Sequence, residues 1–200
     1  MVEKEAQATC SACGVDGESS LVCLACGELC ECTGQDLFAR LGLPPSPRID
    51  LDLLERRYLD LSRRLHPDFQ TGKTDAAQAL ALRNTSLLNE ARATLADDLQ
   101  RMEYLLDQID PDVLDRTKQL DVGFLTESLE LSEEVEQAQA GGDRPALLAI
   151  AEQAHKEMEG RLESTMALWD GSSEQAERMA TQLHEAKVFK RITRDAEAAS

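Results

Sequence analysis

Residues 50–68 read DLDLLERRYLDLSRRLHPD and decide the fold of the middle of the chain. Asp50 suits the start of a helix because its carboxylate can accept the first free backbone amides. The apolar residues that follow recur at helical spacing, which predicts one buried stripe on a helix over residues 51–65. This stripe comprises Leu54, Tyr58, Leu61 and Leu65. Pro67 disfavours helical geometry at the residue before it, so the helix should end at His66.

Four arginines project from this helix, although the chain as a whole is acidic. At about 100° per residue, Arg56 and Arg63 fall opposite the apolar stripe. Arg57 and Arg64 fall on its flank. A solvated helix face would ordinarily explain such a set. The turn His66-Pro67-Asp68 changes that interpretation, because it displays an imidazole and a carboxylate directly beside the basic face.

Two further helices flank this segment and complete a small helical module. Residues 35–43 predict a short helix that ends near Gly42, and three prolines follow within five residues. A second long helix is predicted from about Thr74 to Leu95. Its apolar stripe can pack antiparallel on the first helix. This second stripe comprises Ala81, Asn84, Leu88, Ala91 and Leu95.

Composition and charge limit the class of protein. The chain has 200 residues, of which 42% are hydrophobic and only 4% aromatic; its richness in Leu and Ala favours helix over sheet. The net charge of −17 argues against binding to nucleic acid or anionic lipid, since both require a cationic surface. No apolar run reaches the roughly 18 residues of a membrane span, and the N-terminus resembles no targeting peptide. We therefore expect a cytoplasmic protein.

The acidic excess lies mostly in residues 101–200, which carry 22 acidic and 11 basic side chains. A linking helix is predicted over 97–109. Three long helices with short connections then predict an antiparallel bundle, with helices near 121–140, 145–168 and 173–195. Ser172 and Gln175 match a capping box for the last of these helices. His155 falls on an apolar stripe and is expected to be partly buried.

The helix near 121–140 carries two apolar stripes. The first, which we assign to the core of the bundle, comprises Phe124, Leu131 and Val135. The second lies about 100° away and comprises Leu125 and Leu129. A wide core face would explain both stripes equally well. However, residues 121–143 contain seven acidic residues and no basic one, and apolar anchors rimmed by carboxylates suit a basic protein partner.

All six cysteines lie between positions 10 and 32. Two C-x-x-C pairs can surround one tetrahedral zinc ion with four thiolates, so we expect a structural zinc site at Cys10, Cys13, Cys23 and Cys26. Gly14 and Gly27 follow the two pairs and suit tight turns. The segment is too short for an apolar core, so the metal would supply most of its folding free energy. An iron–sulfur cluster remains an alternative, and the roles of Cys30 and Cys32 stay open.

Several of these stretches together resemble one known family. They are DLFARLGL (36–43), the basic helix with its His-Pro-Asp turn (58–68), LLNEARATLADDLQRMEYLL (87–106) and FLTESLELSEEVEQ (124–137). The resemblance is to the HscB family, J-domain co-chaperones of iron–sulfur cluster assembly, and covers roughly residues 36–195. A cysteine-pair module ahead of the J-domain is similar to the longer, eukaryote-type members. The expected all-α fold has a zinc-binding cysteine module (1–33), a J-domain (34–107) and a C-terminal three-helix bundle (108–200).

The resemblance implies a co-chaperone and not an enzyme. Its J-domain would bind a DnaK/HscA-type chaperone and stimulate ATP hydrolysis in that partner, through Arg56, Arg57, Arg63, Arg64, His66, Pro67 and Asp68. Its bundle would bind the iron–sulfur scaffold protein through Leu125, Thr126, Leu129, Glu130, Glu133, Gln137, Val188 and Phe189. Thr126 and Gln137 depart from the family, which has an apolar and an acidic residue there. A contact on the last helix that is usually aromatic in the family is best matched by Val188, beside Phe189.

Two other functions are compatible with the sequence. One is a zinc-module adaptor without chaperone function, and the less favoured one is a thiol oxidoreductase that uses a C-x-x-C pair. Gly72-Lys73-Thr74 resembles the end of a phosphate-binding loop, but the required first glycine would stand at Pro67. We therefore expect no nucleotide to bind to this chain.

Overall fold

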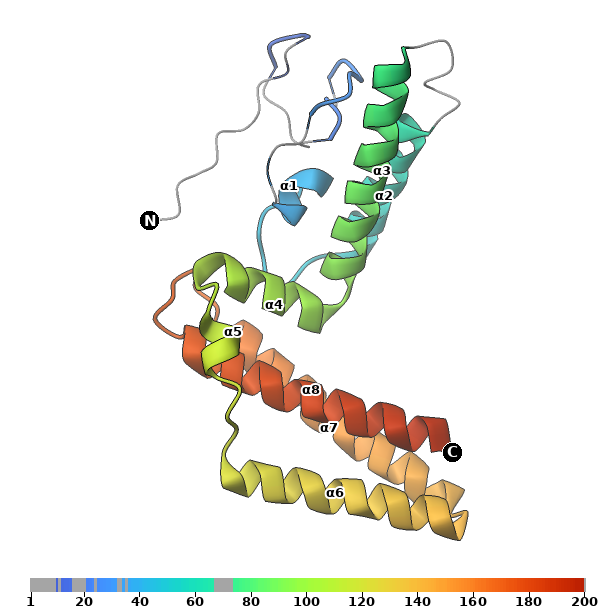
Figure 1. Ribbon diagram of the computed structural model, residues 1–200, viewed down its shortest axis with the longest axis vertical. Coiled ribbons are helices and arrows are strands. Elements are labelled where there is room, and N and C mark those ends of the chain that lie inside the picture. The colour runs from blue at the N-terminus through green and yellow to red at the C-terminus, as the bar shows by residue number, and fades with distance from the viewer. Residues whose placement is uncertain are drawn as a thin grey trace. The chain divides into compact units, whose positions relative to one another are not determined.

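The computed structural model describes residues 10, 12–15, 21–23, 25–31, 34, 36–66 and 74–199. These residues form eight helices and one isolated β-bridge, which confirms the predicted all-α fold (Figure 1). The chain divides into two compact units, Met1–Asp97 and Asp98–Ser200. Among the described residues, no helix combines the length and the apolar character that crossing a membrane would require.

The first unit contains three helices, which are α1 (Leu37–Leu41), α2 (Leu51–Leu65) and α3 (Asp75–Ala96). Asp50 caps α2 as predicted, and the neighbouring helix ends lie near Gly42 and Thr74, where we expected them. The carboxylate of Asp50 accepts the backbone amides of Asp52 and Leu53 at 2.9 and 3.1 Å. The hydroxyl of Thr74 accepts the amide of Ala77 at 3.3 Å, and Gly42 closes α1 in the left-handed conformation. Local capping chemistry thus sets these boundaries.

The α2–α3 pair is antiparallel and buries the two predicted stripes. The buried side chains are Leu54, Leu61 and Leu65 of α2 and Ala81, Asn84, Leu88, Ala91 and Leu95 of α3. Tyr58 is half-buried and donates its hydroxyl to Asn89 at 3.1 Å. The guanidinium of Arg92 lies 4.8 Å from the centre of the Tyr58 ring and pairs with Glu55 at 2.8 Å. These contacts cross the edge of the pair and fix its register.

The second unit contains five helices, which are α4 (Asp98–Ile109), α5 (Val113–Arg116), α6 (Val122–Gly141), α7 (Arg144–Leu168) and α8 (Ala176–Ala199). The three long helices form the predicted bundle, in which α7 and α8 pair most extensively and α6 packs against both. At its core the rings of Phe124 and Phe189 meet edge to face, with centroids 5.6 Å apart. The α4 helix packs on α5, α7 and α8, and therefore belongs to this unit.

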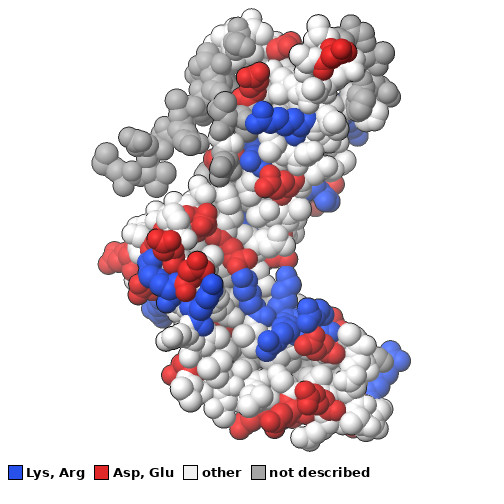
Figure 2. All heavy atoms as spheres, viewed as in Figure 1, with Lys and Arg blue, Asp and Glu red and all other residues white. Residues whose placement is uncertain are grey.

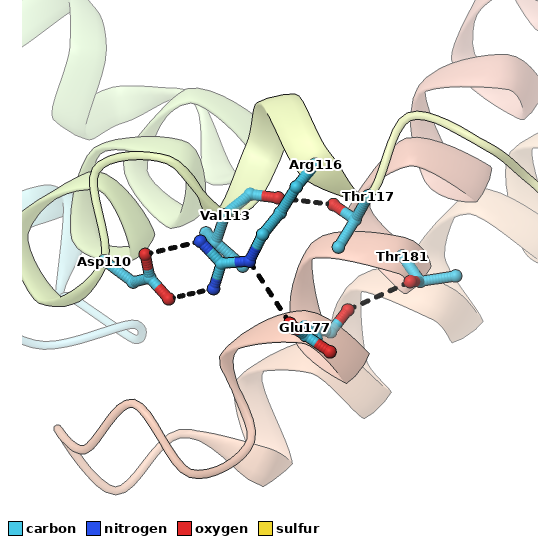
Figure 3. Close-up of polar contacts among 6 residues, drawn as sticks. All are labelled: Asp110, Val113, Arg116, Thr117, Glu177 and Thr181. Carbon is cyan, nitrogen blue, oxygen red and sulfur yellow. Dashed lines mark hydrogen bonds and ion pairs between the residues drawn. The ribbon is translucent and has the colours of Figure 1, made fainter.

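A polar cluster joins α4, α5 and α8 (Figure 3). Two nitrogens of the Arg116 guanidinium donate hydrogen bonds to the carboxylate of Asp110, and its Nε lies 3.2 Å from the carboxylate of Glu177 in α8. The hydrogen bond from Arg116 holds the pKa of Asp110 below its ordinary value. We did not predict α5, because a four-residue helix after Pro111 leaves no periodic pattern to detect.

Two local predictions for the second unit were wrong. The last helix begins at Ala176 and not beside Ser172, because a separate turn intervenes. In that turn Asp170 accepts the amide of Ser172 at 2.8 Å, and the Ser172 hydroxyl accepts the amide of Glu174 at 3.3 Å. The side chain of His155 is 54% exposed and lies 3.3 Å from Glu159, so it is not a core residue.

Candidate functional site

Four cysteine sulfurs come together in the first unit. The Sγ atoms of Cys10, Cys13, Cys23 and Cys26 all lie within 4.8 Å of one another. Cys10 and Cys26 are 3.7 Å apart, and Cys13 and Cys23 are 3.6 Å apart, measured between sulfurs. A tetrahedron with metal–sulfur bonds of about 2.3 Å has edges of about 3.8 Å. The four predicted ligands therefore form a cluster that could bind one metal ion.

Each C-x-x-C pair lies on a turn with the same two backbone hydrogen bonds. The amide of Cys23 donates to the carbonyl of Glu28, and the amide of Gly27 donates to the carbonyl of Cys23, both at 2.8 Å. The turn at Cys10 repeats this pattern at 2.9 and 2.8 Å. Gly14 and Gly27 occupy equivalent places with φ of 72° and 76°, where only glycine is relaxed. The repeated turns aim both thiol pairs at one point.

The electrostatics of the cluster suit a cation. Hydrogen bonds from the backbone, first of all from the amide of Cys26, lower the pKa of the Cys23 thiol to about 6. The amide of Glu28 also lowers the pKa of Cys26, but the neighbouring thiols, Cys23 first, raise it to about 12. Four adjacent thiols cannot all lose their protons without positive charge between them, so this donor set fits a divalent metal.

Cys30, the one further cysteine that the structure describes, is not part of this cluster. Cys30 lies at the base of the hairpin, with its Sγ 3.8 Å from the carbonyl of Glu28. Burial raises the pKa of the Cys30 thiol. Cys32 lies outside the described residues. The site therefore needs no sulfur beyond the four predicted ligands.

The α2 helix presents the predicted basic face. Two of the four arginines are exposed and two are half-buried on the flank of the apolar stripe: Arg56 and Arg63, and Arg57 and Arg64, respectively. Arg64 pairs with Asp60 one turn back at 3.0 Å, and Arg56 lies 3.8 Å from Asp50. Both pairs are solvent-accessible, so they hold the arginines only weakly. The guanidinium groups remain accessible to an acidic partner.

His66 ends this basic face. Its backbone amide donates to the carbonyl of Arg63 at 3.2 Å, and its side chain is exposed. The helix stops at His66, as the proline predicts. Pro67 and Asp68 lie outside the described residues, as do Gly72 and Lys73. The described part of the predicted chaperone-binding set is therefore His66 with the four arginines.

On α6, one apolar stripe faces the core of the bundle and the other faces solvent. Phe124, Leu131 and Val135 are buried, whereas Leu125 and Leu129 are 47% and 59% exposed. The alternative of one wide core face is therefore excluded for α6 in this chain. The polar residues of the predicted scaffold-binding set are all exposed: Thr126, Glu130, Glu133 and Gln137. Figure 2 shows acidic side chains gathered along α6.

Sequence reasoning missed one apolar residue of this face. Val122 is 76% exposed and precedes Leu125 by one turn, so it extends the exposed stripe to the start of the helix. The spacing Val122, Leu125, Leu129 was visible in the sequence. We did not assign Val122 to a binding surface, because it directly follows a capping aspartate and residues in the first turn of a helix are often exposed.

The two candidates on the last helix have different surroundings. Phe189 is 1% exposed, and the guanidinium carbon of Arg161 lies 5.7 Å from the centre of its ring. The expectation that Phe189 lies on a binding surface is therefore wrong: its helical spacing places it in the core with Ile192 and Ala196. Val188 is half-buried and packs against the same core.

Comparison with solved structures identifies the fold, although no protein-family model matches the chain. The chaperone HscB from Vibrio cholerae is similar with a TM-score of 0.68 and 27% sequence identity, over 82% of this chain and 96% of that one. The human co-chaperone protein HscB has a TM-score of 0.77 and 24% identity, over 96% and 98% of the two chains. The chain has the HscB fold.

The resemblance seen in the sequence is thus confirmed by the structure, cysteine cluster included. Similarity to the HscB of Vibrio cholerae, at 27% identity over 82% of this chain, supports a J-type co-chaperone role.

Proposed function

We propose that this HscB-like chain stimulates the ATPase of a DnaK/HscA-type chaperone and delivers an iron–sulfur cluster scaffold protein to it. The observation that carries the proposal is the presence of two unlike faces on one HscB fold. One is the basic face of α2 that ends at His66, and the other is the acidic face of α6 with its exposed leucines. Faces of opposite charge suit two different partners.

The basic face would bind the chaperone. Arg56, Arg57, Arg63 and Arg64 can orient an acidic surface, because guanidinium groups donate several hydrogen bonds in fixed directions. Long-range attraction would speed the encounter. His66, Pro67 and Asp68 would then contact the partner and favour its hydrolysis-competent conformation. In this mechanism His66 removes no proton from a substrate, since the reaction occurs in the chaperone's own nucleotide site.

The α6 face would bind the scaffold. Leu125 and Leu129 provide apolar anchors that gain free energy when a partner covers them. Glu130 and Glu133 surround these anchors with negative charge, which selects a basic surface. Thr126 and Gln137 complete the rim with polar contacts, and Val188 would contribute from α8. The boundaries 34–107 for the J-domain and 108–200 for the scaffold-binding bundle belong to the same proposal.

The cysteine cluster would hold a structural zinc ion through Cys10, Cys13, Cys23 and Cys26. When bound, the metal supplies folding free energy to a segment that is too small to build its own core. The two turns at Gly14 and Gly27 already bring the four thiols close together, so the backbone of this chain shapes the site. Zinc is favoured over an iron–sulfur cluster because a closed set of four thiolates on paired turns is typical of structural zinc sites.

The experiment is steady-state ATP hydrolysis by a purified chaperone with increasing amounts of this protein. The wild type should raise the rate, and His66→Gln should not, although its circular dichroism spectrum should stay helical. Equal effects of both proteins would contradict the role of the turn. A chain without residues 1–33 should still bind the scaffold, whereas loss of all partner binding would favour the adaptor function.

A further inference from the structure

Asn84 is a buried polar residue in the middle of α3 that the proposed partners do not use. Its side chain is 0% exposed, and its amide nitrogen donates to the carbonyls of Leu21 and Cys30, both at 2.9 Å. These acceptors are 63 and 54 residues away in sequence. The side-chain amide has two N–H groups, so its nitrogen can donate one hydrogen bond to each carbonyl. The amide oxygen cannot, because it only accepts.

The two carbonyls belong to the base of the hairpin that carries the second C-x-x-C pair. The amide of Cys30 also donates to the carbonyl of Leu21 at 2.9 Å, and Val22 forms a β-bridge with Leu29. Cys23 directly follows Val22 and is 1% exposed. Figure 1 shows this hairpin beside the N-terminal half of α3. Asn84 thus closes the base of a hairpin whose tip supplies two of the four sulfurs.

We propose that metal binding at the four cysteines and the local stability of α3 are coupled through Asn84. The inference rests on the proposed metal site and assigns that site a task. The metal holds the hairpin in the shape that places the carbonyls of Leu21 and Cys30 opposite Asn84. Without metal the tip of the hairpin is no longer tied to the first C-x-x-C turn, and loosening that spreads to the base would cost the buried amide its acceptors.

Coupling of this kind acts in both directions. If the metal stabilises α3, then α3 stabilises the bound metal by the same factor. Because α3 packs along α2, the metal module supports the helix pair that displays the four arginines. The module would therefore act as a support for the chaperone-binding surface and would not itself need a partner.

The test compares hydrogen exchange in the full chain with zinc and after removal of zinc by a chelator. In the wild type, zinc removal should raise exchange of the α3 amides over residues 81–88 by roughly tenfold, the factor expected for about 1.4 kcal/mol from two hydrogen bonds. Amides of α7, in the other unit, should not respond. Asn84→Leu keeps the volume but removes the donors, so exchange in α3 should no longer depend on zinc.

Asn89→Leu is the matched control, because Asn89 lies on the same helix but contacts Tyr58 and not the hairpin. It should keep the zinc dependence of the wild type. Among the residues that the structure describes, the buried Oδ1 of Asn84 has no hydrogen-bond partner, so Asn84→Leu also removes an unfavourable group. For this reason the readout is the zinc dependence of exchange and not total stability.

The possible outcomes distinguish failure of the proposed coupling from failure of the proposed metal site. If the wild type binds no zinc in native mass spectrometry, both the site and the coupling are overturned. If zinc binds but α3 exchanges equally fast with and without it, or if Asn84→Leu retains the full dependence, the coupling alone is overturned. Should Asn84→Leu fail to fold, Cys13→Ser carries the test, since it should show the metal-free exchange of α3 even with zinc present.

Discussion

Phe124 and Leu125 are neighbours on α6 but face opposite environments. Phe124 is 7% exposed and meets Phe189 edge to face, whereas Leu125 is 47% exposed. One helix therefore divides its apolar residues between the core of the bundle and the surface. The leucines on the surface contribute little to folding, since burial is what makes apolar residues stabilising. Binding and stability can accordingly be changed separately on α6.

The double variant Leu125→Ala/Leu129→Ala should weaken binding of the scaffold protein by roughly 10-fold to 100-fold, because two apolar anchors lose most of their contact area. Isothermal titration calorimetry with a purified scaffold measures this directly. The free energy of unfolding should change by less than about 0.5 kcal/mol per site. Leu131→Ala, on the buried stripe, is the control and should destabilise the fold by about 2–5 kcal/mol. Unchanged scaffold affinity in the double variant would exclude the α6 face.

Reversing one charge on α2 should weaken chaperone binding without unfolding the protein. Arg63 is exposed at the end of the basic face, so Arg63→Glu should lower the affinity for the chaperone by roughly fivefold to tenfold. The association rate should also become less sensitive to salt. Surface plasmon resonance at several salt concentrations gives both quantities. Arg83→Glu changes an exposed arginine of α3 and should have little effect; equal losses in the two variants would indicate a general charge effect.

Removal of one ligand should abolish metal binding, whereas removal of Cys30 should not. Cys10→Ser disrupts the cluster of four sulfurs, and Cys30 lies outside that cluster. Elemental analysis of protein purified without added metal should therefore find about one zinc per chain in the wild type and in Cys30→Ser, and none in Cys10→Ser. Iron in place of zinc would favour the cluster alternative. Metal retained by Cys10→Ser would contradict the assigned ligands.

The ion pair between Arg116 and Asp110 should make stability depend on acid pH. Arg116 holds the pKa of Asp110 below its ordinary value of 3.8, so ionised Asp110 stabilises the fold above that pH. The contribution is lost as the pH falls through the lowered pKa of the folded state, when Asp110 takes up a proton. Arg116→Gln should therefore lower the melting temperature at pH 7 more than at pH 3. Arg178→Gln serves as the control for net charge, and an equal shift at both pH values would disprove the linkage.

Local chemistry explains why the helices of the first unit could be predicted so closely. Asp50, Thr74 and Gly42 stand at the ends of periodic apolar stretches, and each cap acts within a few residues of its own position. The four clustered cysteines were equally visible, because C-x-x-C spacing reflects the turn that holds both thiols. Such patterns can be recognised in a single sequence because they depend only on residues that are close together in the chain.

Features that depend on distant partners were not predictable in the same way. Asn84 was expected on the buried stripe of α3, but its acceptors lie more than fifty residues earlier in the chain. Phe189 was considered for the surface because it stands beside Val188, the best match to a family contact that is usually aromatic. The Arg116 cluster joins three helices through charged residues that leave no periodic pattern. Tertiary packing decides each of these cases.

The central claim is that one chain brings the chaperone and the scaffold together through two faces. The test measures ATP hydrolysis by the chaperone in the presence of the scaffold. The decisive sample is a mixture of two variant proteins, His66→Gln and the double variant Leu125→Ala/Leu129→Ala. The wild type should give a scaffold-dependent increase in rate. The mixture should not, because each variant keeps only one working face and the two faces must belong to one molecule. A mixture as active as the wild type would contradict the claim.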